Sequence, residues 1–333
     1  MNEFKEMLNN ILTQMAEKDA TDLHIVSNEY VYFRIDGDII ATNLKLSSDQ
    51  IYSLCLNALD PLQQNEYLQK ASIDFGYSVN GLRFRGNMCK IGGNHSCVFR
   101  KLNERIFSMD ELQLPEILKS VLNARAGLIL VTGATGSGKS TSLAAMINEI
   151  NETKKFHITT AENPVEYIHP SKQSLVTQRE VGKDTPTFFD CLHDALRRDP
   201  DVIVVGEMRD PQTVSTAIGG AGTGHLVLGT LHTNNAPETI NRILDLYEGA
   251  ARDLVRSQLS SYLLAVVSQQ LVKKKDGGRV AVFELLIPNK EMRQLIREGR
   301  TELLYDCMEK AKDEGNIIMS DMFEEYQKRG IIA

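Results

Sequence analysis

Apolar and polar positions follow two periods in the first hundred residues. Apolar side chains recur at helical spacing over residues 4–15, which predicts an amphipathic helix, and a second helical stretch covers 48–69. Runs rich in β-branched and aromatic residues predict strands at 23–26, 30–35, 38–41, 74–77, 82–88 and 96–99. Asp36-Gly37 favours a hairpin, because a type I′ turn needs positive φ at both central residues. The pattern predicts a small α+β domain with an antiparallel sheet over residues 1–100.

The pattern changes after a polar stretch at 101–114, which we interpret as a linker. Beyond it, short apolar runs alternate with helical segments such as 140–154. The runs lie at 127–131, 156–159, 202–205 and 226–228. Buried strands that alternate with helices indicate a doubly wound α/β sheet, so the fold class is α/β, with a second domain over 115–333. Ligands of such sheets bind beyond the carboxyl ends of the strands.

Composition narrows the function classes. The 333 residues are 42% hydrophobic and 24% charged, with a formal net charge of −7, so the chain has no overall positive field to attract nucleic acid. No apolar run approaches the ~18 residues that span a bilayer, and the N-terminal segment lacks the apolar core of a secretory signal. We therefore expect a cytoplasmic protein that does not cross the membrane. The five cysteines form no CxxC pair, which argues against a zinc site and favours reduced thiols.

The most specific motif directly follows the apolar run at 127–131. It matches GxxxxGK[ST] in full, and with the residue after it comprises Gly133, Ala134, Thr135, Gly136, Ser137, Gly138, Lys139, Ser140 and Thr141. Glycines let backbone N–H groups surround an anion, and the following helix points its positive end at the same place. We expect the Lys139 ammonium to be exposed in the loop and the Ser140 hydroxyl to bind Mg²⁺. ATP and Mg²⁺ are the predicted cofactors.

Acids and histidines follow other strands of the predicted sheet. Glu207 ends the run at 202–205, as in a Walker B motif, while Glu166 follows a turn broken by Pro164. Either acid could be the base or orient the attacking water, and both are candidate catalytic residues. His225 and His232 flank the run at 226–228, and either could sense the γ-phosphate.

Several longer segments, taken together, resemble the secretion and type IV pilus motor ATPases, in the branch of the twitching-motility retraction ATPases. They are GATGSGKSTSLAAMINEIN, AENPVEYIH, QREVG, ALRRDPDVIVVGEMRDPQT and TGHLVLGTLHTNNAPETINRI, with DLHI, RIDGD, GGRVAVFELL and MRQLIREG elsewhere. The resemblance covers nearly the whole chain and weakens over 43–80 and the last thirty residues.

The resemblance implies a homohexameric ring whose subunits carry a PAS-like N-terminal domain and a RecA-like motor domain. It assigns Glu166 to the catalytic glutamate of the acidic "Asp box" and Glu207 to the Walker B acid, and it places His225 and His232 in the "His box". Arg85 and Arg100 fall on the arginines that the small domain sends to the phosphates. One departure is Asn163, where the family usually has Asp.

The function that the resemblance implies is ATP hydrolysis coupled to retraction of a type IV pilus. The implied partners are the inner-membrane platform protein of the pilus machine and related motor ATPases, which would hold the chain at the inner face of the membrane. Assembly ATPases usually carry a tetracysteine insert, which this chain lacks. Two alternatives remain: an accessory ring subunit that hydrolyses weakly, motivated by Asn163, and a secretion, conjugation or DNA-translocating motor, against which the acidic balance argues.

Overall fold

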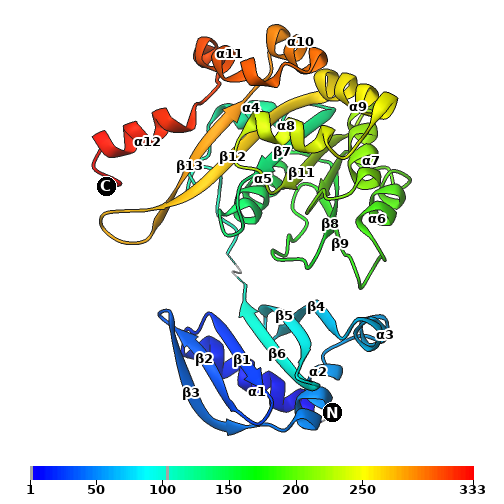
Figure 1. Cartoon of the computed structure of the whole chain (residues 1–333), viewed down its shortest axis with the longest axis vertical. Helices are drawn as coiled ribbons and strands as arrows, with labels where there is room; N and C mark the ends of the chain where they lie inside the picture. The colour runs from blue at the N-terminus through cyan, green and yellow to red at the C-terminus, as the bar shows by residue number, and fades with distance from the viewer. Residues whose placement is uncertain (1–2, 103–104) are drawn as a thin grey trace. The chain divides into compact units, whose positions relative to one another are not determined.

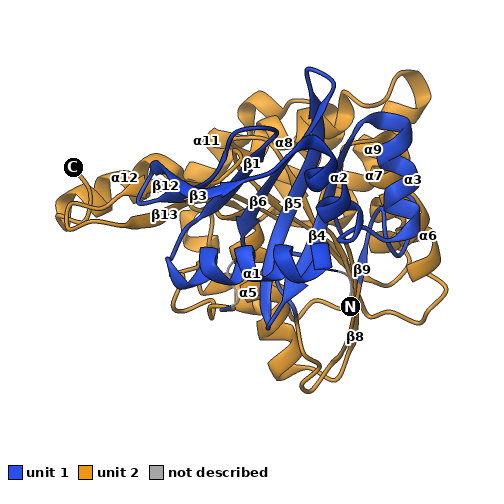
Figure 2. Ribbon diagram, turned by 90° about the horizontal axis from the view of Figure 1, so that it is seen from below, with its two compact units in different colours: residues 1–105, 162–168, 179–187 blue, residues 106–161, 169–178, 188–333 orange. Residues whose placement is uncertain are grey.

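The computed structural model describes residues 3–102 and 105–333, which divide into two units (Figures 1 and 2). Unit 1 comprises Met1–Arg105 together with Glu162–Ile168 and Arg179–Thr187, and unit 2 comprises the rest of the chain. The two inserted segments lie far along the chain from the predicted boundary near residue 100. Unit 1 is therefore assembled from three stretches of sequence.

Unit 1 contains a six-stranded antiparallel sheet with the strand order β3-β2-β1-β6-β5-β4. Its strands are β1 (Asp22–Val26), β2 (Tyr30–Ile35), β3 (Asp38–Lys45), β4 (Ser72–Val79), β5 (Leu82–Ile91) and β6 (Asn94–Lys101). All six predicted strands are present. Asp36 and Gly37 have φ values of 51° and 94°, so the positive backbone angles expected of the β2–β3 turn are confirmed.

Helices α1 (Glu3–Glu17), α2 (Ser48–Leu56) and α3 (Pro61–Lys70) complete unit 1. The single helix predicted over 48–69 was wrong, because the chain breaks before Pro61. Proline has no N–H to continue a helix and instead starts α3, while the Asp60 carboxylate accepts hydrogen bonds from the N–H groups of Leu62 and Gln63.

One face of this sheet is apolar and packs against the helices. Buried side chains of α1, including Leu8, Leu12 and Met15, share a core with aromatic residues of the sheet. Phe75 and Phe99 meet edge to face, with ring centroids 5.7 Å apart. The opposite face carries charged residues, because successive side chains of a strand point to opposite sides.

Unit 2 is built on a seven-stranded sheet with the order β13-β12-β7-β11-β10-β8-β9. The strands are β7 (Gly127–Thr132), β8 (His157–Glu162), β9 (Leu175–Glu180), β10 (Val202–Val205), β11 (Leu226–Leu231), β12 (Leu263–Lys273) and β13 (Arg279–Leu286). Its central strands are parallel, and β13 pairs with β12 in the antiparallel sense. The expected α/β class is confirmed, although β9, β12 and β13 were not predicted.

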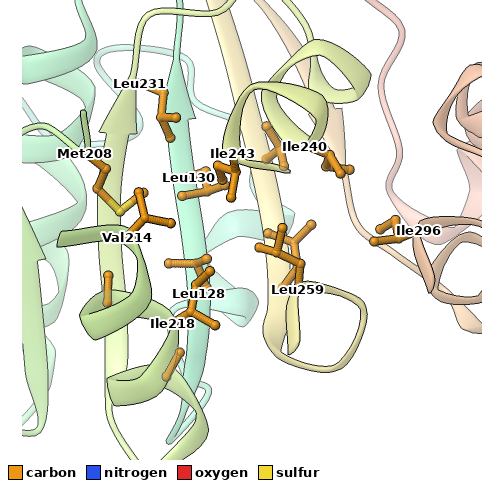
Figure 3. Packing of buried hydrophobic residues seen from close by; sticks show 14 of the residues in the cluster. Leu128, Leu130, Met208, Val214, Ile218, Leu231, Ile240, Ile243, Leu259 and Ile296 are labelled. Atoms are coloured by element: carbon orange, nitrogen blue, oxygen red, sulfur yellow. The ribbon is translucent and has the colours of Figure 1, made fainter. Parts of the chain in front are cut away.

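Helices cover both faces of this sheet. They are α4 (Ile117–Val121), α5 (Lys139–Thr153), α6 (Phe188–Ala195), α7 (Pro211–Gly222), α8 (Ala236–Leu244), α9 (Gly249–Tyr262), α10 (Lys290–Glu298), α11 (Leu304–Lys310) and α12 (Met319–Lys328). Figure 3 shows one core of this unit, a cluster that includes Leu128 and Leu130 of β7, Ile218 of α7 and Leu259 of α9. On the other face, α5 buries Leu143 with other apolar residues. This double burial fixes the ends of the parallel strands.

The stretch predicted as a linker differs from a solvated connection. Its residues 103–104 lie outside the described residues, but Met109 and Leu114 belong to the core of unit 2, with 1% and 6% of their surfaces exposed. Between residues 3 and 333, leaving aside 103–104, no helix combines the length and apolar character needed to cross a bilayer. The five cysteines are thiols that form no disulfide, and all but Cys89 are buried.

Candidate functional site

The phosphate loop joins β7 to α5 in a backbone conformation that needs glycine. Gly133, Gly136 and Gly138 have φ values of 145°, 79° and 90°. A Cβ on Gly133 would lie 2.4 Å from the carbonyl oxygen of Gln269 and 2.5 Å from Ser137 Oγ, so a side chain is excluded there. Gly138 caps α5 without a side-chain hydrogen bond, which leaves N–H groups at this helix start for an anion.

Lys139 begins α5, and its side chain folds back over the loop. Its ammonium donates to the carbonyl oxygens of Gly133 and Ala134, at 2.7 and 3.0 Å. The residue is only 9% exposed, so the expectation of an exposed ammonium was wrong. These two carbonyls attract the charge into the loop. Ser140 and Thr135 are exposed, and Thr141 is half-buried.

Glu207 lies at the same edge of the sheet, because β7, β11 and β10 are parallel neighbours. Gly206 and Met208, on either side of it, both hydrogen-bond Thr230, which is in register with Val131 of β7. The Glu207 carboxylate contacts Arg209 and also lies 3.1 Å from His232 Nε2. Strand register therefore brings a carboxylate, an imidazole and the phosphate loop together.

His232 directly follows β11 and connects the two charged groups. Its Nδ1 lies 3.4 Å from the Lys139 ammonium, while its Nε2 faces Glu207. Burial lowers the pKa of His232, and the neighbouring Lys139 charge lowers it further, although Glu207 acts in the opposite direction. The imidazole is therefore favoured in its neutral form, with one nitrogen able to accept and the other to donate.

The two histidines of the "His box" do not lie together. His225 precedes β11 and contacts the carbonyl oxygen of Gly220, at 3.1 Å from Nδ1. A strand rises about 3.3 Å per residue, so the seven steps from His225 to His232 place them on the order of 20 Å apart. His232 is the histidine beside this phosphate loop. The same edge carries a hollow of about 580 Å³ lined by Thr135, Glu207, Arg209, His232 and Arg242, among others.

Gln269 is a loop contact that sequence reasoning missed. It is 1% exposed on β12, and its Nε2 donates to the carbonyl oxygen of Ser137 at 2.6 Å. The preceding Ser268 is hydrogen-bonded to Thr132, so β12 supports the start and the middle of the loop. The signal that could have found it is the apolar run Leu263–Val267, which marks the start of β12 and was not predicted as a strand.

Glu166 lies in unit 1, on the inserted segment Glu162–Ile168. Its side chain is half-buried between Val165 and Tyr167, which are 5% and 7% exposed. Asn163 is exposed. The structure therefore divides the two candidate acids between the units, with Glu207 in unit 2.

Arg85 and Arg100 are direct cross-strand partners on β5 and β6 of unit 1. Both point to the charged face of the sheet, where Arg85 lies 3.6 Å from Asp74 and Arg100 lies 2.7 Å from Asp22. Burial would raise the pKa of Asp22, but hydrogen bonds from Arg100 and Thr21 lower it below its ordinary value. The side chains of Arg85 and Arg100 are 45% and 68% exposed, so both guanidinium groups are accessible from this face of the sheet.

The donor chemistry of unit 2 fits a magnesium nucleotide. Mg²⁺ takes few protein ligands, all oxygens, and completes its shell with water and phosphate oxygens. Ser140 is the second residue of α5, and the Glu207 carboxylate lies at the same sheet edge. The N-terminus of α5, where Gly138 provides no side-chain cap, suits the phosphates.

Comparisons with known proteins identify the relatives of this chain. The family model of type II/IV secretion system proteins matches residues 2–329. The chain is 43% identical over 303 residues to a twitching motility protein of Neisseria gonorrhoeae, covering 90% of this chain and 81% of that protein. It is 40% identical over 325 residues to the type IV pilus retraction ATPase PilT of Pseudomonas aeruginosa, covering 97% and 94%. The crystal structure of the pilus retraction motor PilT with bound ADP superposes with a TM-score of 0.89 at 41% identity, covering 98% and 94%.

Proposed function

This chain belongs to the family of type II/IV secretion system proteins, and from that premise we propose that it powers the retraction of type IV pili. It is an ATPase of this family. Two observations together support the proposal. The chain is 40–43% identical to retraction proteins over most of its length. It also has a complete phosphate loop beside Glu207 and His232. The protein acts in the cytoplasm, held at the inner face of the membrane by the platform protein of the pilus machine.

In the proposed reaction, water attacks the γ-phosphate in line with the departing ADP. The loop amides and Lys139 would bind the phosphates. Ser140 and Glu207 would hold Mg²⁺, which would supply positive charge to neutralise the phosphate oxygens. Glu166 orients the attacking water and takes its proton. Arg85 and Arg100 present guanidinium groups suited to charge that spreads over the phosphoryl oxygens.

The working form is proposed to be a homohexamer, because pulling on a filament requires several sites that act in turn. With an ATP analogue and Mg²⁺, light scattering should give a mass near six times 37.3 kDa, about 224 kDa. A mass of 37.3 kDa at every micromolar concentration would contradict the ring.

The proposed direction of work is tested in cells. Cells that lack this chain should keep surface pili but lose retraction and twitching, and the wild-type chain should restore both, whereas Lys139→Ala should not. An assembly motor would give the opposite phenotype, since its loss removes the pili. Loss of neither pili nor movement would instead favour an accessory subunit.

A further inference from the structure

A buried ion pair in unit 1 encloses the backbone of the residue before Glu166. Arg83 Nε donates to the carbonyl oxygen of Val165 at 2.8 Å, and Arg83 Nη2 donates to Glu180 Oε2 at 2.8 Å. The same Glu180 oxygen accepts the N–H of Val165 at 3.0 Å. Both polar backbone groups of Val165 are therefore held by one arginine and one glutamate. We call this arrangement the Val165 clamp.

The sheet of unit 1 leaves space for the clamp and contacts it through β4. The side chains of Arg83 and Glu180 are 14% and 4% exposed, and a third arginine nitrogen, Nη1, donates to Ser78 of β4. Gly76 of β4 lies beneath the pair. A Cβ there would be 2.8 Å from Glu180 Oε2 and 2.9 Å from Arg83 Nη2, so a side chain would force the pair to shift.

The pair is poorly arranged for stability alone. Glu180 Oε1 is buried and finds no hydrogen-bond partner among the residues that the structure describes. Burying two charges usually costs about as much as their attraction returns, and an unsatisfied carboxylate oxygen adds to that cost. What the pair achieves is geometry, because a planar guanidinium directs its N–H donors in fixed directions.

From these contacts we propose that Arg83 and Glu180 are positioning residues for Glu166. They fix the peptide that carries the Glu166 Cα, and thus the direction in which its carboxylate leaves the chain. This rests on the proposed role of Glu166 as the water-orienting carboxylate. A displacement of about 1 Å at such a group is enough to slow a reaction on the order of a hundredfold. The segment with Glu166 is thereby attached to β5, the strand that also carries Arg85.

The first test is Arg83→Lys, which keeps the charge but cannot bind Val165 and Glu180 together through a planar fork. We expect kcat for ATP hydrolysis to fall at least tenfold while the Kd for MgADP, measured by calorimetry, changes less than twofold. Lys70→Gln is the matched control, because Lys70 forms an exposed pair with Glu66 on α3, and it should leave both values unchanged. A folded Arg83→Lys protein with kcat within twofold of the wild type would overturn the proposal.

The second test separates positioning from general damage by repeating Arg83→Lys in a Glu166→Gln background. If the clamp acts through Glu166, Arg83→Lys should lower kcat less than twofold in the Glu166→Gln background. Equal falls in both backgrounds would overturn the proposal. If Glu166→Gln alone leaves kcat unchanged, the proposed role of Glu166 fails, which is a distinct result. Should Arg83→Lys not fold, the double variant Arg83→Met, Glu180→Met removes both buried charges and is compared in the same two backgrounds under the same criteria.

Discussion

Replacing Lys139 by alanine is expected to reduce ATP turnover at least a hundredfold while the protein stays folded. The ammonium sits over the phosphate loop, bonded to the carbonyl oxygens of Gly133 and Ala134, and alanine removes the only full charge within the loop. A factor of one hundred corresponds to about 2.7 kcal/mol of lost transition-state stabilisation. The fold should persist because α5 remains anchored through Leu143 and Ile147. Turnover is measured by phosphate release at saturating MgATP.

Lys155→Ala is the matched control, because this lysine is exposed just beyond α5 and should have no effect. The melting temperature of both variants should remain within a few degrees of the wild type. If Lys139→Ala retains more than a tenth of the turnover, the loop does not bind the reacting phosphates.

Glu207→Gln and Glu166→Gln are each expected to lower hydrolysis about a hundredfold or more and to leave nucleotide binding intact. Glutamine keeps the size of the side chain and removes its charge, while the loop amides and Lys139 still hold the phosphates. The expected size is typical for loss of a general base or of a group that orients water. Rates and binding are measured separately, by single turnover and by equilibrium titration.

The two variants should differ in their need for Mg²⁺. Glu207 lies at the sheet edge beside the phosphate loop, so Glu207→Gln should raise the Mg²⁺ concentration for half-maximal ATP binding. Glu166 is proposed to act on the attacking water and not on the metal, so its variant should not. The same Mg²⁺ dependence in both variants would refute this division of roles. An unchanged rate in Glu166→Gln would leave Glu207 as the remaining carboxylate candidate.

Local patterns predicted the parts of the site that are contiguous in sequence. The phosphate loop is one unbroken motif between a buried strand and a helix. These two elements, adjacent to it in sequence, determine its shape. Glu207 and His232 could be placed beside it because each follows an apolar run, and parallel strands end at one edge. Periodicity alone gave a single helix over 48–69, where the missing N–H of Pro61 decided the outcome.

Contacts between distant segments could not be predicted in this way. The residues that hold Val165 come from positions 82 and 15 residues away in the chain, and no short pattern marks them. Gln269 supports the loop from 132 residues beyond Ser137. His225 and His232 are close in sequence, yet an extended strand separates them. Sequence proximity is a poor guide to spatial proximity wherever a strand intervenes.

The three-part composition of unit 1 limits how this chain can be cut or exchanged. A fragment that starts after residue 105 would retain Glu162–Ile168 and Arg179–Thr187 without the sheet on which they fold. The carbonyl oxygen of Val165 would then lose the hydrogen bond from Arg83, and Glu180 would lose its ion pair. If residues 1–105 alone were exchanged between relatives, β5 of one protein would have to pack against the two inserted segments of the other. Residues 1–105 and the two inserted segments should therefore be exchanged together in recombination, and a side chain at Gly76 should need a matching change at Arg83 or Glu180.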